Sequence, residues 1–206
     1  MIMTMPMLPI SAASNWNIHQ LCDDLNDNGF ALLDHAYSDD FFLQIREECL
    51  ENLQEFKDAA IQNGVVSQIR SDHILWINPE LPTAYQHIKA LEVLSDLLNQ
   101  NFYLGIKNVE AHFACYNPGE FYALHRDNPQ QKNHRIISTV LYLQEKWQEN
   151  WGGLLRLQDK HGNWHLIEPH PNRLAVFQSD LLHEVLAAQQ QRLSITGWLR
   201  SDQNLW

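Results

Sequence analysis

The sequence predicts a mainly β fold, a sandwich or barrel of short strands supported by two N-terminal helices. Two stretches with helical spacing of apolar residues come first, and short runs rich in Val, Ile, Thr and aromatic residues follow. The first of these runs precedes the second helical stretch, and no helical pattern separates the runs after it. Many short strands without intervening helices favour a sandwich or barrel over an alternating βαβ fold.

The first helical stretch follows Ser38-Asp39-Asp40, a good helix start, and precedes Asn63-Gly64. Its apolar side chains recur every three or four positions, at Phe41, Ile45, Cys49, Leu53, Phe56 and Ala60. The second stretch begins at Pro82-Thr83 and ends at Asn99 to Asn101. Its buried stripe is expected at Ala84, Ile88, Leu91, Leu94 or Ser95, and Leu98.

The strands are separated by turn signals such as Asn-Pro, Gly-Gly and Gly-Asn. They are expected at 65–78, 109–116, 120–125, 135–143, 153–157, 164–167, 173–178, 182–187 and 192–199. The chain shows no repeat, low-complexity tract or linker. We therefore expect a single domain over 1–206, with the Met-rich residues 1–14 flexible.

Charge and cysteine content narrow the function classes. The 206 residues carry 14 Lys plus Arg against 25 Asp plus Glu, a net charge of −11, which argues against a nucleic-acid partner. Cys22, Cys49 and Cys115 form no CxxC and are expected to be free thiols, as in a reducing cytosol. No stretch resembles a signal peptide or is apolar enough to span a bilayer, so the sequence predicts a cytoplasmic protein without a membrane partner.

Two strands indicate which face of the sheet lines a pocket. Alternation over 192–199 places Arg192, Ser194, Thr196 and Trp198 on one face and Leu193, Ile195 and Leu199 on the other. Over 135–143 the first face holds Ile136, Ser138, Val140 and Tyr142, and the second holds Ile137, Thr139, Leu141 and Leu143. If the apolar faces pack under the helices, the polar faces line a ligand pocket.

Three residues form a candidate metal site. His125 and Asp127 are two positions apart, so in an extended segment their side chains point the same way. His183 begins a predicted strand later in the chain and is the candidate third ligand. Two imidazoles and one carboxylate leave coordination positions open, which suits non-haem iron(II) and oxygen chemistry better than a closed structural zinc site. The alternative is a surface His beside a turn Asp.

Arg192 is the candidate anchor for an anionic ligand. It lies nine residues after His183 and on the polar face. A buried guanidinium needs a counter-charge, and its planar fork matches a carboxylate. A dicarboxylate ligand would supply that charge, and the alternative is a structural ion pair with an Asp or Glu.

These residues belong to a longer pattern that resembles the prolyl 4-hydroxylase domain of the EGL-nine-like, hypoxia-sensing type. The resemblance covers about two thirds of the chain and includes a hairpin around Arg70 to Trp76. Its motifs are 114–119 (ACYNPG), His125-x-Asp127-Asn128-Pro129, Arg135, Tyr142-Leu143, Gly152-Gly153-x-Leu155-Arg156, Ile167-x-Pro169, Arg173-Leu174, His183-Glu184-Val185, Arg192 and Trp198.

The resemblance implies a double-stranded β-helix (jelly-roll) core over 109–199 and an iron(II)- and 2-oxoglutarate-dependent dioxygenase that uses O2. Iron would be held by His125, Asp127 and His183, the reactivity would reside on iron, and no protein general base is predicted. Ascorbate is a candidate reductant. The residues implied for binding 2-oxoglutarate are Arg192, Tyr142, Tyr116, Val140, Thr196 and Trp198. Those implied for binding substrate are Arg70, Asp72, Trp76 and Arg135.

Three functional hypotheses stay open at this point. The first is hydroxylation of a prolyl residue in a protein such as elongation factor Tu. The second is the same chemistry on a small molecule or another side chain, which the acidic composition favours. The third is a non-catalytic metal-binding jelly-roll module. The tract between Asp127 and Arg135 carries Gln130, Gln131 and Lys132, where members of the family usually have smaller residues. This difference puts the identity of the substrate in doubt.

Overall fold

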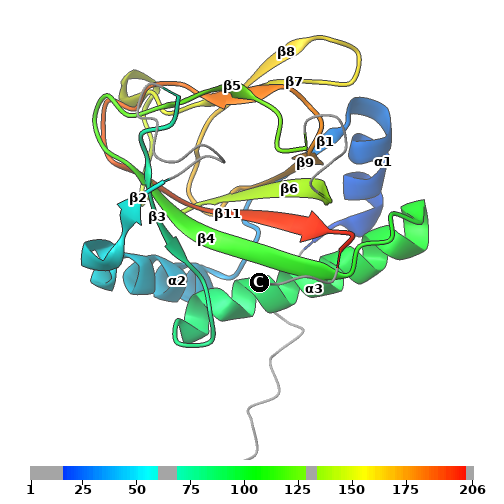
Figure 1. Ribbon diagram of the computed structural model, residues 1–206, viewed down its shortest axis with the longest axis horizontal. Coiled ribbons are helices and arrows are strands. Elements are labelled where there is room, and N and C mark those ends of the chain that lie inside the picture. Colours follow the sequence, from blue (N-terminus) through cyan, green and yellow to red (C-terminus); the bar gives the residue numbers. More distant parts are fainter. Residues whose placement is uncertain (1–15, 60–68, 129–133, 203–206) are drawn as a thin grey trace, which may run out of the picture.

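Two antiparallel β-sheets face each other in this computed structural model, with helices packed outside the larger one (Figure 1). The structure describes residues 16–59, 69–128 and 134–202. The helices are α1 (Ile18–Asn28), α2 (Asp39–Glu51) and α3 (Pro82–Phe102), with 3₁₀ turns at Leu53–Glu55 and Glu149–Trp151. The strands are β1 (Phe30–Leu33), β2 (Lys57–Asp58), β3 (His73–Trp76), β4 (Asn108–Tyr116), β5 (Tyr122–His125), β6 (Arg135–Tyr142), β7 (Leu155–Gln158), β8 (Trp164–Ile167), β9 (Leu174–Gln178), β10 (His183–Val185) and β11 (Arg192–Arg200).

The large sheet has the order β1-β9-β6-β11-β4-β3-β2, and the small sheet has the order β5-β10-β7-β8. Neighbours in each sheet pair antiparallel although most are distant in sequence. Two facing sheets joined in this way give the predicted jelly-roll architecture. The predicted strands are confirmed to within a few residues, except that of the expected 65–78 only β3 is a strand, and residues 60–68 lie outside the described residues.

The prediction for the first helix was right at its start and wrong at its end. The Ser38 side chain accepts a hydrogen bond from the Phe41 amide, and two aspartates occupy the first turn, which suits the helix dipole. Helix α2 ends at Glu51 and not near Ala60, which lies outside the described residues. Lys57 and Asp58 instead pair with Ile74 and His73, so the chain leaves the helix to add an edge strand.

The second helix agrees with its prediction. Pro82 opens α3, and the expected stripe is buried, including both Leu94 and Ser95. The helix lies across the outer face of the large sheet (Figure 1). It comes very close to β11 at Gly197, where an added Cβ would lie 3.1 Å from Leu91 Cδ1 and 2.8 Å from Thr139 Oγ1. Only glycine fits at this crossing without displacing a neighbour.

Helix α1 and strand β1 were not predicted. The α1 helix is short, and its apolar residues Ile18, Leu21, Cys22 and Leu25 recur at helical spacing, although only Leu21 and Leu25 are buried. Its ends are nevertheless well defined, because Asn17 caps the start and Gly29 ends it with φ 83°. Strand β1 then pairs with β9 at the edge of the large sheet.

The predicted division into a polar and an apolar face is confirmed except at Ile136, which packs against the helix-side core beside a register irregularity between β11 and β6. Leu193, Ile195 and Leu199 of β11 are buried in the core between the large sheet and the helices. Val140 and Tyr142 of β6 belong to a second core between the two sheets. The inner face of the large sheet is therefore the floor of the space where the candidate site residues meet.

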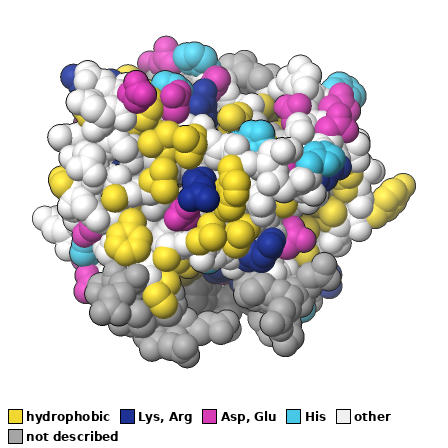
Figure 2. All heavy atoms as spheres, turned by 90° about the horizontal axis from the view of Figure 1, so that it is seen from above, with side chains coloured by type: hydrophobic (Ala, Val, Ile, Leu, Met, Phe, Trp, Pro, Cys, Tyr) yellow, Lys and Arg dark blue, Asp and Glu magenta, His cyan; other side chains and the backbone are white. Residues whose placement is uncertain are grey.

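The outer face of the small sheet is solvent-exposed. Seen from above, this side of the molecule carries hydrophobic side chains grouped around a basic one (Figure 2). Exposed apolar side chains on these strands include Leu124, Trp164 and Leu166. Arg156 stacks on Trp164 at 4.1 Å and donates a hydrogen bond of 2.7 Å to Glu184.

Among the described residues, no helix is long and apolar enough to cross a membrane. The three cysteines are free, as predicted, with Cys49 and Cys115 buried. A single domain over 1–206 stays a prediction, and the flexibility expected for 1–14 concerns residues outside the described part of the chain.

Candidate metal centre and anion anchor

His125, Asp127 and His183 converge as predicted. Strands β5 and β10 of the small sheet pair so that His125 faces His183. Asp127 follows β5 by two residues, and one potential ligand atom from each of the three side chains lies within 4.8 Å of the others. The Asp127 oxygens are each 3.5 Å from an imidazole Nε2, Oδ1 from that of His125 and Oδ2 from that of His183.

Backbone carbonyls orient both imidazoles. His125 Nδ1 lies 2.7 Å from the Ala123 oxygen, and His183 Nδ1 lies 2.9 Å from the Leu181 oxygen. A carbonyl oxygen only accepts, so in each neutral ring the proton is on Nδ1 and the Nε2 lone pair is free for a metal. The outer-shell hydrogen bond is the usual way in which proteins fix a metal-binding histidine.

The carboxylate is held from the opposite sheet. Ser138 of β6 donates a hydrogen bond of 2.6 Å to Asp127 Oδ2, and its hydroxyl lies 2.8 Å from that of Ser179. Burial would raise the pKa of Asp127, but His183, His125 and Ser138 beside it more than offset this and hold its pKa well below the usual range. Burial lowers the pKa of His183 to about 4. The site therefore presents an ionised carboxylate and a neutral imidazole at neutral pH.

This donor set fits iron(II). Two imidazoles and a carboxylate can occupy one face of an octahedron and leave the other face for small molecules. No fourth His, Cys, Asp or Glu joins the cluster within the described ranges. A closed four-ligand zinc site would need one.

Arg192 is buried without a carboxylate partner. It is 3% exposed, and its guanidinium donates to the Gly153 carbonyl at 2.9 Å and to the Ser194 hydroxyl at 3.1 Å. In residues 16–59, 69–128 and 134–202, no Asp or Glu pairs with it. The remaining stretches contain no Asp or Glu at all. The structural ion pair considered as an alternative is therefore ruled out, and the charge calls for an anionic ligand.

The Gly152-Gly153 turn makes room for this arginine. Both glycines have positive φ, and a Cβ on Gly153 would lie 2.9 Å from Arg192 Cδ. A Cβ on Gly152 would lie 2.5 Å from the Ala187 carbonyl oxygen. The turn brings the Gly153 carbonyl to Arg192, and a side chain at either glycine position would disturb this close approach.

The other residues predicted around the co-substrate surround Arg192 or continue along β11. Its guanidinium lies 4.9 Å from the Tyr116 ring and 5.0 Å from the Tyr142 ring. The Tyr142 hydroxyl is buried and has no hydrogen-bond partner within the described chain. Burial raises the pKa of that hydroxyl, and the Arg192 charge partly offsets the rise. Thr196 and Val140 face each other across β11 and β6.

Trp198 lies near the far end of the same face. Arg135 stacks on its ring at 3.5 Å and donates two hydrogen bonds to Glu110, of 3.0 and 2.9 Å. Trp76 of β3 lies 6.4 Å from the Trp198 ring. Of the four residues predicted to bind substrate, Arg135 and Trp76 therefore belong to one aromatic cluster.

Arg70 and Asp72, the other two, pair with each other. The guanidinium donates to both carboxylate oxygens, at 2.6 and 2.9 Å, and Asp72 is 1% exposed. Arg70 also stacks on Tyr122 at 4.7 Å, and the Tyr122 ring lies 3.7 Å from His125. The pair that the resemblance implied for substrate binding therefore packs, through Tyr122, against the candidate metal site.

Sequence reasoning missed the polar residues that support the site. Ser138 was placed on the correct face, but its contact with Asp127 could not be inferred from alternation alone. Ser179 and Ser194 were also missed, because neither stands in a motif. The Ser194 position on the same face as Arg192 was the only signal that it could contact the guanidinium.

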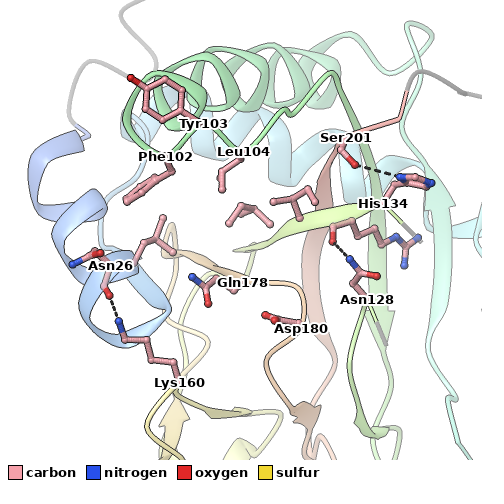
Figure 3. Close-up of a pocket in the computed structure, with 14 residues that line it drawn as sticks. Asn26, Phe102, Tyr103, Leu104, Asn128, His134, Lys160, Gln178, Asp180 and Ser201 are labelled. Carbon is pink, nitrogen blue, oxygen red and sulfur yellow. Dashed lines mark hydrogen bonds between the residues drawn. The ribbon is translucent and has the colours of Figure 1, made fainter. Parts of the chain in front are cut away.

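A separate hollow of about 750 Å³ lies between α1, the end of α3 and the neighbouring strands (Figure 3). Its described lining contains none of the three metal-site residues and does not contain Arg192. Asn128 and Asp180 belong to the two loops that lead to the ligands, and both line it. Lys160 at its edge donates a hydrogen bond to the Asn26 carbonyl, so its ammonium group already has a partner within the protein.

Comparisons with known proteins agree with this geometry. Residues 111–200 match the model of the 2OG-Fe(II) oxygenase superfamily. A prolyl-4-hydroxylase from Pseudomonas putida is 36% identical, with TM-score 0.83, over 90% of this chain and 99% of that one. A prolyl hydroxylase from Trichoplax adhaerens, solved with a hypoxia-inducible factor peptide fragment, is 27% identical, with TM-score 0.81, over 89% of each chain.

A viral collagen prolyl hydroxylase from Paramecium bursaria Chlorella virus-1, solved as a 2OG complex, shares the fold, with 20% identity and TM-score 0.57 over 86% of this chain and 98% of that one. No curated protein sequence matched the chain.

Proposed function

Because the chain belongs to the 2OG-Fe(II) oxygenase superfamily, we propose that it hydroxylates a prolyl residue of a protein substrate. The observation that carries the chemistry is the pairing of an open His-Asp-His site with a buried arginine that has no carboxylate partner. The structural similarity to prolyl hydroxylases, one of them solved with a peptide, supports the choice of substrate.

When iron(II), 2-oxoglutarate and O2 are bound, they supply the oxidising chemistry: one oxygen atom enters the substrate C–H bond as hydroxyl, and the other enters succinate as carbon dioxide is released. The protein contributes position and shielding from water. In our proposal, His125, Asp127 and His183 hold the metal.

Arg192 would bind the distal carboxylate of 2-oxoglutarate, and Tyr142 would donate a hydrogen bond to it. This assignment explains two features at once, since the arginine needs an anion and the tyrosine hydroxyl needs an acceptor. Tyr116, Val140 and Thr196 would line the space between this anchor and the metal. No side chain of the site is needed as a general base.

Trp198, which the resemblance assigned to 2-oxoglutarate, stacks with Arg135 and lies near Trp76, so in our proposal these three residues would form the substrate side. Arg135 is already fixed by Glu110, so its role would be to present a flat guanidinium face beside Trp198. Arg70 and Asp72 would shape the adjoining wall. Elongation factor Tu is the candidate target, ascorbate the candidate reductant, and the cytoplasm the proposed location.

One experiment tests the proposal directly. The protein with iron(II) and 2-oxoglutarate is incubated with a panel of prolyl-containing proteins that includes elongation factor Tu. Succinate is measured together with peptide mass spectrometry for one added oxygen on a prolyl residue. Succinate that rises with a given protein and matches its hydroxyproline supports the proposal. Oxidation of a different side chain, or of none, would refute the prolyl assignment.

A small-molecule substrate is the second candidate, and one observation favours it. Arg70 and Asp72 satisfy each other, so neither offers a free charge to a peptide. The double variant Arg70→Gln with Asp72→Asn distinguishes the two candidates, because it removes both charges while keeping shape. For a protein substrate we expect hydroxylation to be lost and the slow decarboxylation of 2-oxoglutarate without substrate to be kept.

Equal loss of both rates in the double variant would show that the pair supports the fold, and loss of neither would favour a small substrate. Arg70→Gln alone is the matched control for the double variant, because it removes one charge of the pair and keeps the other. It leaves Asp72 as an unpaired buried charge, which costs about 3–5 kcal/mol of stability. A non-catalytic module, the third hypothesis, does not agree with the chain's membership of an oxygenase family.

A further inference from the structure

His112 is a buried histidine on the floor of the site that the proposed function does not use. It lies on β4, opposite Thr196 of β11 and Trp76 of β3. Its ring is 5.3 Å from the Trp198 ring and 5.1 Å from the Trp76 ring, and the residue is 1% exposed. By alternation along β4, it shares the inner face of the sheet with Tyr116.

The hydrogen bond at Nδ1 identifies the tautomer. His112 Nδ1 lies 3.0 Å from the Phe113 carbonyl oxygen, which can only accept, so Nδ1 carries the proton. Burial lowers the pKa of His112 to about 3, with a further lowering from the nearby Arg70 charge, and the ring is therefore neutral at physiological pH. Its Nε2 is then a hydrogen-bond acceptor.

This acceptor lies beside an unsatisfied donor. His112 Nε2 and Trp198 Nε1 are both buried, and neither has a hydrogen-bond partner among the residues that the structure describes. An indole N–H only donates. Leaving such groups unpaired is unfavourable, and proteins satisfy them with an ordered water or a ligand group.

We propose that His112 and Trp198 together hold one O–H group, which accepts a hydrogen bond from Trp198 Nε1 and donates one to His112 Nε2. An O–H is the smallest group that both accepts and donates a hydrogen bond, so it suits a position enclosed by buried side chains. The position adjoins the metal site, because Trp198 pairs with Ser138 across β11 and β6, and Ser138 donates to Asp127.

Two sources can supply this O–H group. Solvent water is one. The second rests on the proposed function: a prolyl ring has no N–H and no hydroxyl, and hydroxylation gives it the O–H group that fits this position. In that case His112 and Trp198 would distinguish product from substrate and would be positioning residues for the new hydroxyl.

Nitrogen NMR of the protein loaded with zinc(II) and 2-oxoglutarate tests the water source without any turnover. Zinc is diamagnetic and redox-inert, so the 15N-labelled His112 ring and the Trp198 indole can be observed. We expect a proton on Nδ1, an Nε2 shift typical of a hydrogen-bonded acceptor, and a hydrogen-bonded indole N–H. A proton on Nε2, or an Nε2 shift typical of a free nitrogen that no probe changes, would overturn the proposal.

Two probes then identify the source. N-acetyl-L-proline methylamide and its trans-4-hydroxy counterpart are added separately to the same sample. A shift of His112 Nε2 with the hydroxylated probe alone supports the product hydroxyl as occupant. A hydrogen-bonded resting shift that neither probe changes supports water. The resting spectrum is independent of catalysis, so failure of the prolyl assignment would leave this result intact.

Matched variants show that the contact is specific. His112→Gln retains an acceptor oxygen, whereas His112→Leu removes it at similar volume. We expect the Trp198 N–H to stay hydrogen-bonded in the Gln variant and to lose that signature in the Leu variant. Trp198→Phe gives the reciprocal observation at His112 Nε2 and serves if the Leu variant does not fold. An indole signal unchanged in the Leu variant would contradict a shared occupant.

Discussion

The two ends of the site are supported very differently. At the metal end, each ligand has a partner of its own: Ala123 and Leu181 carbonyls for the histidines, and Ser138 for Asp127. At the anchor end, the Arg192 guanidinium donates to two neutral groups, the Gly153 carbonyl and the Ser194 hydroxyl. We therefore expect the metal end to tolerate the loss of one supporting group, whereas the anchor end should depend on the single side chain of Arg192.

The largest effect is expected from the metal ligands themselves. His125→Ala, Asp127→Ala or His183→Ala should each remove stoichiometric iron(II) binding and reduce turnover by more than about 100-fold, the upper range for loss of a supporting group. Metal analysis and a succinate assay check this, with circular dichroism as the control for folding. Activity retained by His183→Ala would disprove the assigned triad. Asp127→Glu should also be damaging, because one extra methylene misplaces the carboxylate.

The next largest effect is expected at the anchor. Arg192→Ala should raise the concentration of 2-oxoglutarate needed for half-maximal rate by about 10- to 100-fold, as for loss of a charge-assisted hydrogen bond. Iron binding should remain. Arg192→Lys should recover only part of the loss, because a point charge replaces a planar fork. An unchanged requirement for 2-oxoglutarate in both variants would mean that the anion binds elsewhere.

A smaller effect is expected from the support of the carboxylate. Ser138→Ala should weaken iron(II) binding by about 10-fold, near the lower limit for outer-shell groups, without changing the 2-oxoglutarate requirement. A metal titration measures it. Ser179→Ala is the matched control, since the Ser179 hydroxyl contacts that of Ser138. If the control weakens iron binding more than Ser138→Ala does, the two serines have been assigned the wrong roles.

The smallest effect is expected from the tyrosine at the anchor. Tyr142→Phe removes one hydrogen bond and should weaken 2-oxoglutarate binding by about 1–2 kcal/mol. Equilibrium binding to the iron-loaded protein measures this. Arg192 remains in place, so maximal rate at saturating co-substrate should be retained. A loss as large as that of Arg192→Ala would show that the ring orients the guanidinium and does more than donate to the ligand.

Sequence patterns could predict the strands and the pairing of His125 with Asp127 because both depend on local spacing. Alternation places Arg192 and Trp198 on one face, and the side chains of His125 and Asp127 point to the same place in the structure, as their spacing predicts. The end of α2 was not predictable, because Lys57 and Asp58 leave the helix to pair with β3, a contact made far from them in sequence. The Arg70–Asp72 pairing was missed for a similar reason, since burial by the surrounding chain decides whether neighbouring charges meet each other or a ligand.

The contacts of Arg70 with Tyr122, and of Tyr122 with His125, join the proposed substrate side to a candidate metal ligand in a single stack. The Tyr122 ring separates the Arg70 guanidinium from the His125 imidazole. In our proposal, a displacement of Arg70 would therefore change the electrostatic environment of a metal ligand without contact with the metal. The absorption spectrum or the magnetic properties of a bound transition metal would then report a displacement of Arg70. Substrate binding could be followed optically before any product forms.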